Sequence, residues 1–160
     1  MTSDRTQTHA DEQVYSPIDG MRVPIGHVAD PVFAFELLGS SVAIEPCSST
    51  LAAPMAGSIT FLSKTRHVIG ITSDAGAELL IHAGIDTILL KGAPFSLHVA
   101  MGDRVEVGDA LMEIDLAAIE EAGMASTIIV IVADSDDYSV VEKIGAGLVQ
   151  TGDELMRLIV

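Results

Sequence analysis

Short apolar runs follow one another along the chain from position 14 onward, and Gly, Pro, Asp and Ser separate them. Such runs, when turn residues recur about every 8–12 positions, are typical of a β-sandwich or a β-barrel. The pattern therefore predicts an all-β fold. The clearest runs are 42–44, 58–62, 68–71, 79–81, 85–90 and 127–132.

Two short segments have helical character instead. Residues 116–122 follow Asp115, whose side chain can cap a helix N-terminus, and Gly123 provides a stop signal. A second, weaker helical turn is predicted over 31–38, where Asp30 is the cap and a proline occupies the first helical position. We therefore expect one or two short helices beside the strands.

Two pairs of segments resemble each other within the chain. Residues 102–114 are echoed by 146–158, and the turn at 16–20 is echoed by the turn at 53–57. A solenoid needs at least three repeats. These echoes therefore favour an antiparallel β-sandwich that consists of two related halves packed together.

The first 13 residues differ in texture from the rest. They carry almost no apolar side chains, so they cannot bury enough surface to offset the entropy of ordering. We expect residues 1–13 to form a flexible polar tail, in which His9 is solvated. Residues 14–160 are predicted to form a single domain, which is an ordinary domain size.

Charge and cysteine content narrow the partners and the compartment. Eight Lys and Arg against 23 Asp and Glu give a formal net charge of −15, which argues against nucleic acid and anionic membranes and favours a basic protein partner. The single cysteine, Cys47, fits a reducing compartment. No run approaches the roughly 20 apolar residues of a membrane span. These observations predict a cytoplasmic protein without stable membrane insertion.

Two histidines are the best candidates for chemistry. Strand alternation puts Glu78, Leu80 and His82 on one face, and a turn at 73–76 would bring His67 close to His82 if the flanking strands pair. A strand histidine is more often a packed, hydrogen-bonded residue, and this structural interpretation stays open here. Two histidines with a carboxylate such as Asp86 could also hold zinc with an open position.

Several other chemistries lack their motifs. The chain has no P-loop, no G-x-G-x-x-G after a strand and no nucleophile elbow. Cys47 has no cationic neighbour in sequence that would lower its pKa. A biotin or lipoyl carrier would need a lysine in the turn at 53–57, where none occurs.

The order of the motifs resembles that of a known family. The matching segments are 16–20, 30–34, 53–57, 67–76, 78–91 and 102–115, and the most specific piece is Glu78-Leu-Leu-Ile-His-Ala-Gly-Ile-Asp-Thr87. In these residues the chain resembles the glucose-class enzyme IIA domain of the bacterial sugar phosphotransferase system. The resemblance extends from about residue 14 to the C-terminus.

This resemblance implies a cytoplasmic β-sandwich that relays a phosphoryl group. Phosphohistidine HPr would donate the group to His82, which would pass it to the cysteine of a cognate IIB domain coupled to a IIC permease. By the same resemblance, His67 is the second active-site histidine and Thr65 orients it. No cofactor is implied for this transfer, although some members share a zinc ion between histidines like His67 and His82 and a partner's carboxylate.

The resemblance also implies a surface around the histidines. Asp30 and Asp86 correspond to flanking acidic residues. The apolar docking positions are Val32, Phe33, Leu37, Leu38 and Leu80.

Two other functions stay open at this point. One is a regulatory binding module that docks on permeases or metabolic enzymes with little transfer activity. The other is a zinc hydrolase on a similar scaffold, which is weaker because the sequence offers no evident third protein ligand.

Overall fold

Side chains of the central strands alternate between two faces, as the sequence pattern predicts. The computed structural model describes residues 9–160. In strand β7 (Glu78–Ala83), Leu79 and Ile81 point into the main core, whereas Leu80 packs in a second, smaller cluster on the opposite face. His82 shares the face of Leu80 because side chains two positions apart point the same way. His82 is thus outside the main core.

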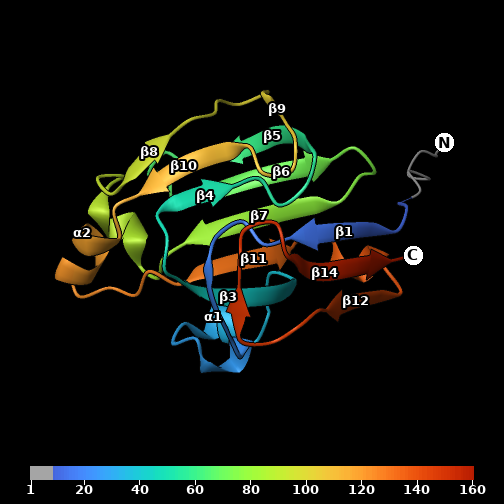
Figure 1. Ribbon diagram of the computed structural model, residues 1–160, viewed down its shortest axis with the longest axis horizontal. Coiled ribbons are helices and arrows are strands. Elements are labelled where there is room, and N and C mark those ends of the chain that lie inside the picture. The colour runs from blue at the N-terminus through green and yellow to red at the C-terminus, as the bar shows by residue number, and fades with distance from the viewer. Residues whose placement is uncertain (1–8) are drawn as a thin grey trace.

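Within residues 9–160, the strands form three sheets in which every pairing is antiparallel. An eight-stranded sheet has the order β13-β2-β3-β11-β7-β6-β5-β9, and two three-stranded sheets have the orders β1-β14-β12 and β4-β10-β8 (Figure 1). The remaining bounds are β1 (Glu12–Tyr15), β2 (Gly20–Val23), β3 (Ser40–Pro46), β4 (Thr50–Ala52), β5 (Gly57–Leu62), β6 (Val68–Ser73), β8 (Phe95–Leu97), β9 (Arg104–Val105), β10 (Ala110–Ile114), β11 (Ile128–Val132), β12 (Val140–Lys143), β13 (Leu148–Val149) and β14 (Glu154–Ile159).

The sheet order reads as two equivalent halves that meet between β11 and β7. One half contains β13, β2, β3 and β11, in that order. The other half contains the equivalent strands β9, β5, β6 and β7, in the same order. Each half also contains one of the small sheets. The second half, β4 to β10, is inserted in sequence between β3 and β11. The repeat at 102–114 forms β9 and β10, and its echo at 146–158 forms β13 and β14. The predicted all-β sandwich of related halves is confirmed.

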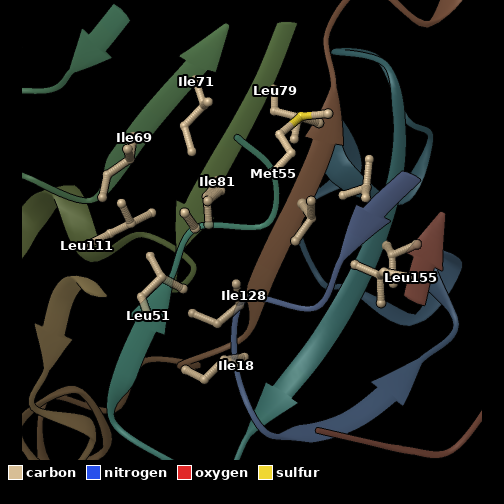
Figure 2. Close-up of a cluster of buried hydrophobic side chains, with 14 of the residues drawn as sticks. Ile18, Leu51, Met55, Ile69, Ile71, Leu79, Ile81, Leu111, Ile128 and Leu155 are labelled. Carbon is tan, nitrogen blue, oxygen red and sulfur yellow. The ribbon is translucent and has the colours of Figure 1, made fainter. Parts of the chain in front are cut away.

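The main core lies between the large sheet and the two small ones. Figure 2 shows side chains from both kinds of sheet meeting there, with Ile81 of β7 facing toward Leu51 of β4 and Leu111 of β10 nearby. Fully burying one such side chain contributes on the order of 1.5–3 kcal/mol. The core is almost entirely aliphatic, which agrees with the 4% aromatic content of the chain.

Two short helices begin where the sequence predicts. Helix α1 (Pro31–Ala34) begins after Asp30, whose Oδ1 accepts a hydrogen bond from the Val32 amide at 2.9 Å. Helix α2 (Leu116–Glu121) begins after Asp115. Helix α1 ends earlier than predicted because the left-handed backbone of Glu36 (φ 54°) cannot continue a helix. Within residues 9–160, no helix is long and apolar enough to cross a membrane.

The N-terminal segment is more structured than its composition predicts. Strand β1 begins at Glu12 and pairs with β14, so the domain starts before residue 14. His9 is half-buried, and its Nε2 lies 2.8 Å from the Asp134 carboxylate, so the expectation of a solvated His9 is wrong. The pairing partner comes from a loop 125 positions away, which local composition cannot indicate. Residues 1–8 of the predicted tail lie outside the described residues.

Candidate functional site

His67 and His82 lie side by side at one end of neighbouring strands. Val68, the first residue of β6, is paired with His82 of β7, and the His67 carbonyl accepts a hydrogen bond from the Ala83 amide at 2.7 Å. The two imidazole ring centroids are 5.0 Å apart and the rings are nearly perpendicular, at 83°. The strand pairing that the spacing of these histidines permits is the one the chain adopts.

The ring of His82 is held in one tautomer. Its Nδ1 lies 2.8 Å from the carbonyl oxygen of Gly84. A carbonyl oxygen can only accept, so Nδ1 carries the proton. A neutral imidazole has one protonated nitrogen, and the lone pair is therefore on Nε2. Because the ring is half-buried, part of it is open to solvent. This arrangement suits a nucleophile that uses Nε2.

The turn after His82 is built to hold that carbonyl in place. Gly84 has a φ of 80°, and its amide donates to the Thr127 carbonyl at 2.8 Å. The Thr87 hydroxyl donates to the Ala83 carbonyl, which closes the turn from the other side. A Cβ on Gly84 would lie 2.3 Å from Cγ2 of Thr87. Only glycine fits here, because the backbone is left-handed and Thr87 occupies the space that a side chain would need.

His67 is oriented by hydroxyl groups rather than by a carbonyl. Its Nδ1 lies 2.6 Å from Oγ1 of Thr65 and 3.3 Å from Oγ of Ser63. The Ser63 hydroxyl oxygen also accepts from the Val68 amide, which keeps the serine in position. Thr65 is a predicted site residue, whereas Ser63 is a contact that the sequence analysis does not assign. A hydroxyl four residues before a histidine carries no signal of its own.

Both histidines are neutral near pH 7. Burial, followed by the neighbouring His67, lowers the pKa of His82 to about 4, although its bond to Gly84 and the nearby carboxylates of Asp30 and Asp86 act in the opposite direction. Burial also lowers the pKa of His67. A neutral ring has a free lone pair, and such a ring can act as a nucleophile without first losing a proton.

The two predicted acidic residues flank His82 from different segments. Asp30 caps α1, and Asp86 is exposed at the start of the 3-10 helix η3 (Thr87–Leu90). Both carboxylates act on the pKa of His82, which places them within electrostatic range of the ring. They give the surroundings of the two histidines a negative character.

Some of the predicted apolar positions are buried beside the histidines, and others are exposed at the surface. Phe33 is only 5% exposed, and its ring centroid lies 4.7 Å from that of His82, so it forms a wall of the site. Leu80 is half-buried. The exposed positions are Val32, Leu37 and Leu38.

We add two further aromatic residues to these apolar positions, although no sequence pattern singles them out. Phe35 is the C-cap of α1, the helix that contains Val32 and Phe33, and it is 75% exposed. Phe61 of β5 is on the histidine face, because a Cβ placed on Gly70 would touch both the Phe61 Cβ and the Leu80 side chain. The pairing of β5 and β6 shifts register near this residue, so simple alternation does not predict its direction. We call the set Val32, Phe33, Phe35, Leu37, Leu38, Phe61 and Leu80 the apolar rim.

Comparisons with known proteins agree on one family. Residues 12–138 match the family described as phosphoenolpyruvate-dependent sugar phosphotransferase system, EIIA 1. The chain is 40% identical over 143 residues to a glucose-specific EIIA component of Halalkalibacterium halodurans, which covers 89% of this chain and 83% of the relative. It is similar to the solved structure of glucose permease IIA from Mycoplasma capricolum, with a TM-score of 0.81 and 30% sequence identity. The match covers 92% of this chain and 95% of that structure's chain.

Some relatives are much longer than this chain. A β-glucoside-specific EIIBCA component of Dickeya chrysanthemi is 42% identical over 149 residues, which are 93% of this chain but 24% of that protein. The chain therefore spans about a quarter of the length of such a relative.

Proposed function

Because the chain belongs to the EIIA family of the phosphoenolpyruvate-dependent sugar phosphotransferase system, and within it resembles the glucose-specific components, we propose that His82 is its phosphoryl acceptor. In this proposal the donor is phosphohistidine HPr, and the recipient is the cysteine of a cognate IIB domain of a sugar permease. The EIIBCA name of the Dickeya relative supports a IIB partner, because in that protein the three parts share one chain.

The observation that carries the proposal is the hydrogen bond between His82 Nδ1 and the Gly84 carbonyl. It leaves the Nε2 lone pair free to form the new N–P bond, while the P–N bond of the donor breaks and its electron pair returns to the donor ring. The proton stays on Nδ1, where the carbonyl stabilises the positive charge that develops on the imidazole. Because the donor is already an activated phosphoramidate, the transfer needs mainly positioning.

His67 would donate a hydrogen bond to the phosphoryl oxygens. If Thr65 donates its hydroxyl proton to Nδ1 of His67, then Nε2 of His67 carries a hydrogen. The perpendicular packing of the rings puts this second imidazole beside the nucleophile. It can then donate to an equatorial oxygen as the charge is redistributed in the transition state.

The apolar rim would form the docking surface. Apolar groups around the histidines exclude water when a partner binds, which slows hydrolysis of the phosphoramidate. The net charge of −15 favours partners with basic surfaces and accelerates their encounter more than it strengthens the complex. With a partner's carboxylate, Nε2 of His82 would also supply a ligand to a shared zinc ion. Nε2 of His67 would supply a second ligand in its other tautomer, in which Nδ1 carries the proton and donates to the Thr65 hydroxyl.

A labelling experiment tests the proposal. The protein is incubated with labelled phosphoenolpyruvate, enzyme I and HPr, and the incorporated phosphate is measured. We expect one acid-labile phosphate in the parent chain and none in His82→Ala. His98→Ala is the matched control, because His98 is a half-exposed strand-flanking histidine on another part of the molecule, and it should be labelled fully. Normal labelling of His82→Ala would overturn the assignment.

The same preparation separates this function from the regulatory alternative. A phosphoryl relay should release its partner differently in the two phosphorylation states, and the label should move to the IIB domain. Binding to permease that does not change with phosphorylation, together with no transfer of label, would favour the regulatory binding module.

A further inference from the structure

A cluster of metal-ligand side chains lies at the end of β7 that is opposite to His82. It consists of His9, which precedes β1, and of Asp134 and Asp137 in the loop between β11 and β12. His9 Nε2 is 2.8 Å from Oδ2 of Asp134 and 3.9 Å from Oδ2 of Asp137, and the ligand atoms all lie within 4.8 Å of one another. Among residues 9–160, this is the one such group of three.

The cluster is separate from the two active-site histidines. Asp134 Oδ1 accepts from the amide of Glu78, the first residue of β7. His82 is four positions further along that strand, which corresponds to roughly 13 Å at the usual rise per residue. The cluster is therefore not part of the proposed phosphoryl-transfer site.

A buried phenol next to the cluster has an unused hydroxyl. Tyr138 is 7% exposed, and its Oη has no hydrogen-bond partner in the part of the chain that the structure describes. Its ring contacts the His9 ring edge-on, at a centroid distance of 5.0 Å. Burial, followed by the carboxylates of Asp134 and Glu12, raises the pKa of this phenol, so both carboxylates are within electrostatic range of it. A buried hydroxyl without a partner is costly, and a metal-bound water would provide one.

The cluster also carries more negative than positive charge, which favours a bound cation. One imidazole faces two carboxylates directly, and Glu12 adds a third whose Oε2 accepts from the Ser73 hydroxyl. Even a protonated His9 would leave this corner of the molecule negative. A divalent cation would offset the excess and bring a water shell to the phenol.

We propose that His9, Asp134 and Asp137 bind a divalent transition-metal ion, with zinc as the best match. Ligand atoms at about 2.0–2.2 Å from one zinc ion lie roughly 3.0–3.5 Å from one another. The 2.8 and 3.9 Å separations lie on either side of that range, so a small side-chain movement completes the site. The imidazole nitrogen favours zinc over magnesium or calcium, which prefer oxygen ligands only. The bound ion would fasten the segment before β1 to the loop between β11 and β12.

The test uses the full chain after treatment with a chelator. Zinc is titrated calorimetrically, and the melting temperature is recorded with and without zinc at about 100 times the Kd. We expect one equivalent of zinc and a rise of roughly 5–10 °C, because binding to the folded state alone stabilises it. His9→Gln and Asp137→Asn should each weaken binding at least tenfold. Asp134 is left intact because it also accepts from the Glu78 amide.

Two controls locate the bound ion. Asp136→Asn changes the charge of the same loop outside the cluster and should bind zinc like the parent. His67→Gln removes a potential ligand at the other end of the strand. Because the shared zinc proposed there needs a partner's carboxylate as a further ligand, this variant of the isolated chain should also bind zinc like the parent. If His9→Gln and Asp137→Asn bind zinc with parental affinity, or if only His67→Gln loses it, then the cluster is an ion pair only and the proposal is overturned. Phosphorylation of His82 is measured separately and does not decide this outcome.

Discussion

The Nδ1 atom of His82 lies 2.8 Å from the carbonyl oxygen of Gly84, two residues further along the chain. This contact assigns the proton to Nδ1 and leaves the ring's lone pair on Nε2, the atom that we propose as the nucleophile. The geometry of the turn, rather than a neighbouring carboxylate, therefore decides which nitrogen carries the proton.

Gly84→Ala should damage both the turn and phosphoryl transfer. The added Cβ would meet Cγ2 of Thr87 on a backbone with φ of 80°, so the carbonyl must move away from His82. We expect a loss of about 2–4 kcal/mol in the free energy of unfolding and at least a tenfold slower phosphorylation. Urea denaturation and the labelling rate measure these effects.

Gly102→Ala is the matched control for that variant. Gly102 has a similar φ of 89°, but nothing lies within 4 Å of the Cβ position. It should therefore cost only about 1 kcal/mol and leave the labelling rate unchanged. Equal effects of the two substitutions would show that the contact with Thr87 has no part in holding the carbonyl.

Stability should fall as the solution is acidified from pH 6.5 to about 4. The folded pKa of His82 is about 4 and that of His67 is also lowered, so over this window the unfolded chain binds more protons than the folded chain. The free energy of unfolding therefore decreases as the pH falls, by about 3 kcal/mol from His82 alone. Urea denaturation of the parent and of His82→Ala at several pH values measures the difference. The same slope in both chains would contradict the assignment.

Two substitutions should shift the pKa of His82 in opposite directions. His67→Gln removes a neighbouring imidazole that disfavours the charged ring, so the pKa should rise. Asp30→Asn removes a carboxylate that favours the charged ring, so the pKa should fall, while asparagine still caps α1. Titration of the His82 ring resonances by NMR measures both shifts. Shifts of the same sign would contradict this account.

His67→Gln should accept phosphate on His82 but pass it on poorly. The Nδ1 contact of His82 with Gly84 is untouched, so the nucleophile keeps its tautomer. The imidazole donor that Thr65 orients is replaced by an amide without that ring contact, and a positioned donor to the phosphoryl oxygens matters most when a negatively charged thiolate attacks. We expect near-parental labelling by HPr and at least a tenfold slower transfer to the IIB cysteine. Transfer at the parental rate would make His67 only a packing residue.

The two phenylalanines beside α1 should separate stability from docking. Phe33→Ala removes a buried ring and should cost about 3–5 kcal/mol, whereas Phe35→Ala, with a side chain 75% exposed, should change the melting temperature little. Phe35→Ala should nevertheless raise the KM for HPr severalfold. Leu148→Ala, which removes a 76% exposed side chain from β13, is the control that should leave KM unchanged. Equal KM values for both variants would remove Phe35 from the docking surface.

Short-range sequence patterns correctly predicted the features that depend only on neighbouring residues. The N-caps at Asp30 and Asp115 and the alternation along β7 depend on neighbours within a few positions, and each is confirmed. The pairing of His67 and His82 was also within reach, because a tight turn joins their strands. Features that depend on residues far apart in the sequence were not predicted. Examples are the contact of His9 with Asp134 and the exposure of Phe35.

The sequence by itself determined the class of fold, the two related halves, the helix starts and the histidines that share one site, because periodicity, capping and short turns are properties of adjacent residues. Only the tertiary structure decided which nitrogen of His82 is free, how far its pKa is lowered and which apolar side chains remain exposed. These depend on Thr127, Phe33 and other groups brought together from distant positions. Burial and hydrogen-bond geometry exist only once those segments have packed.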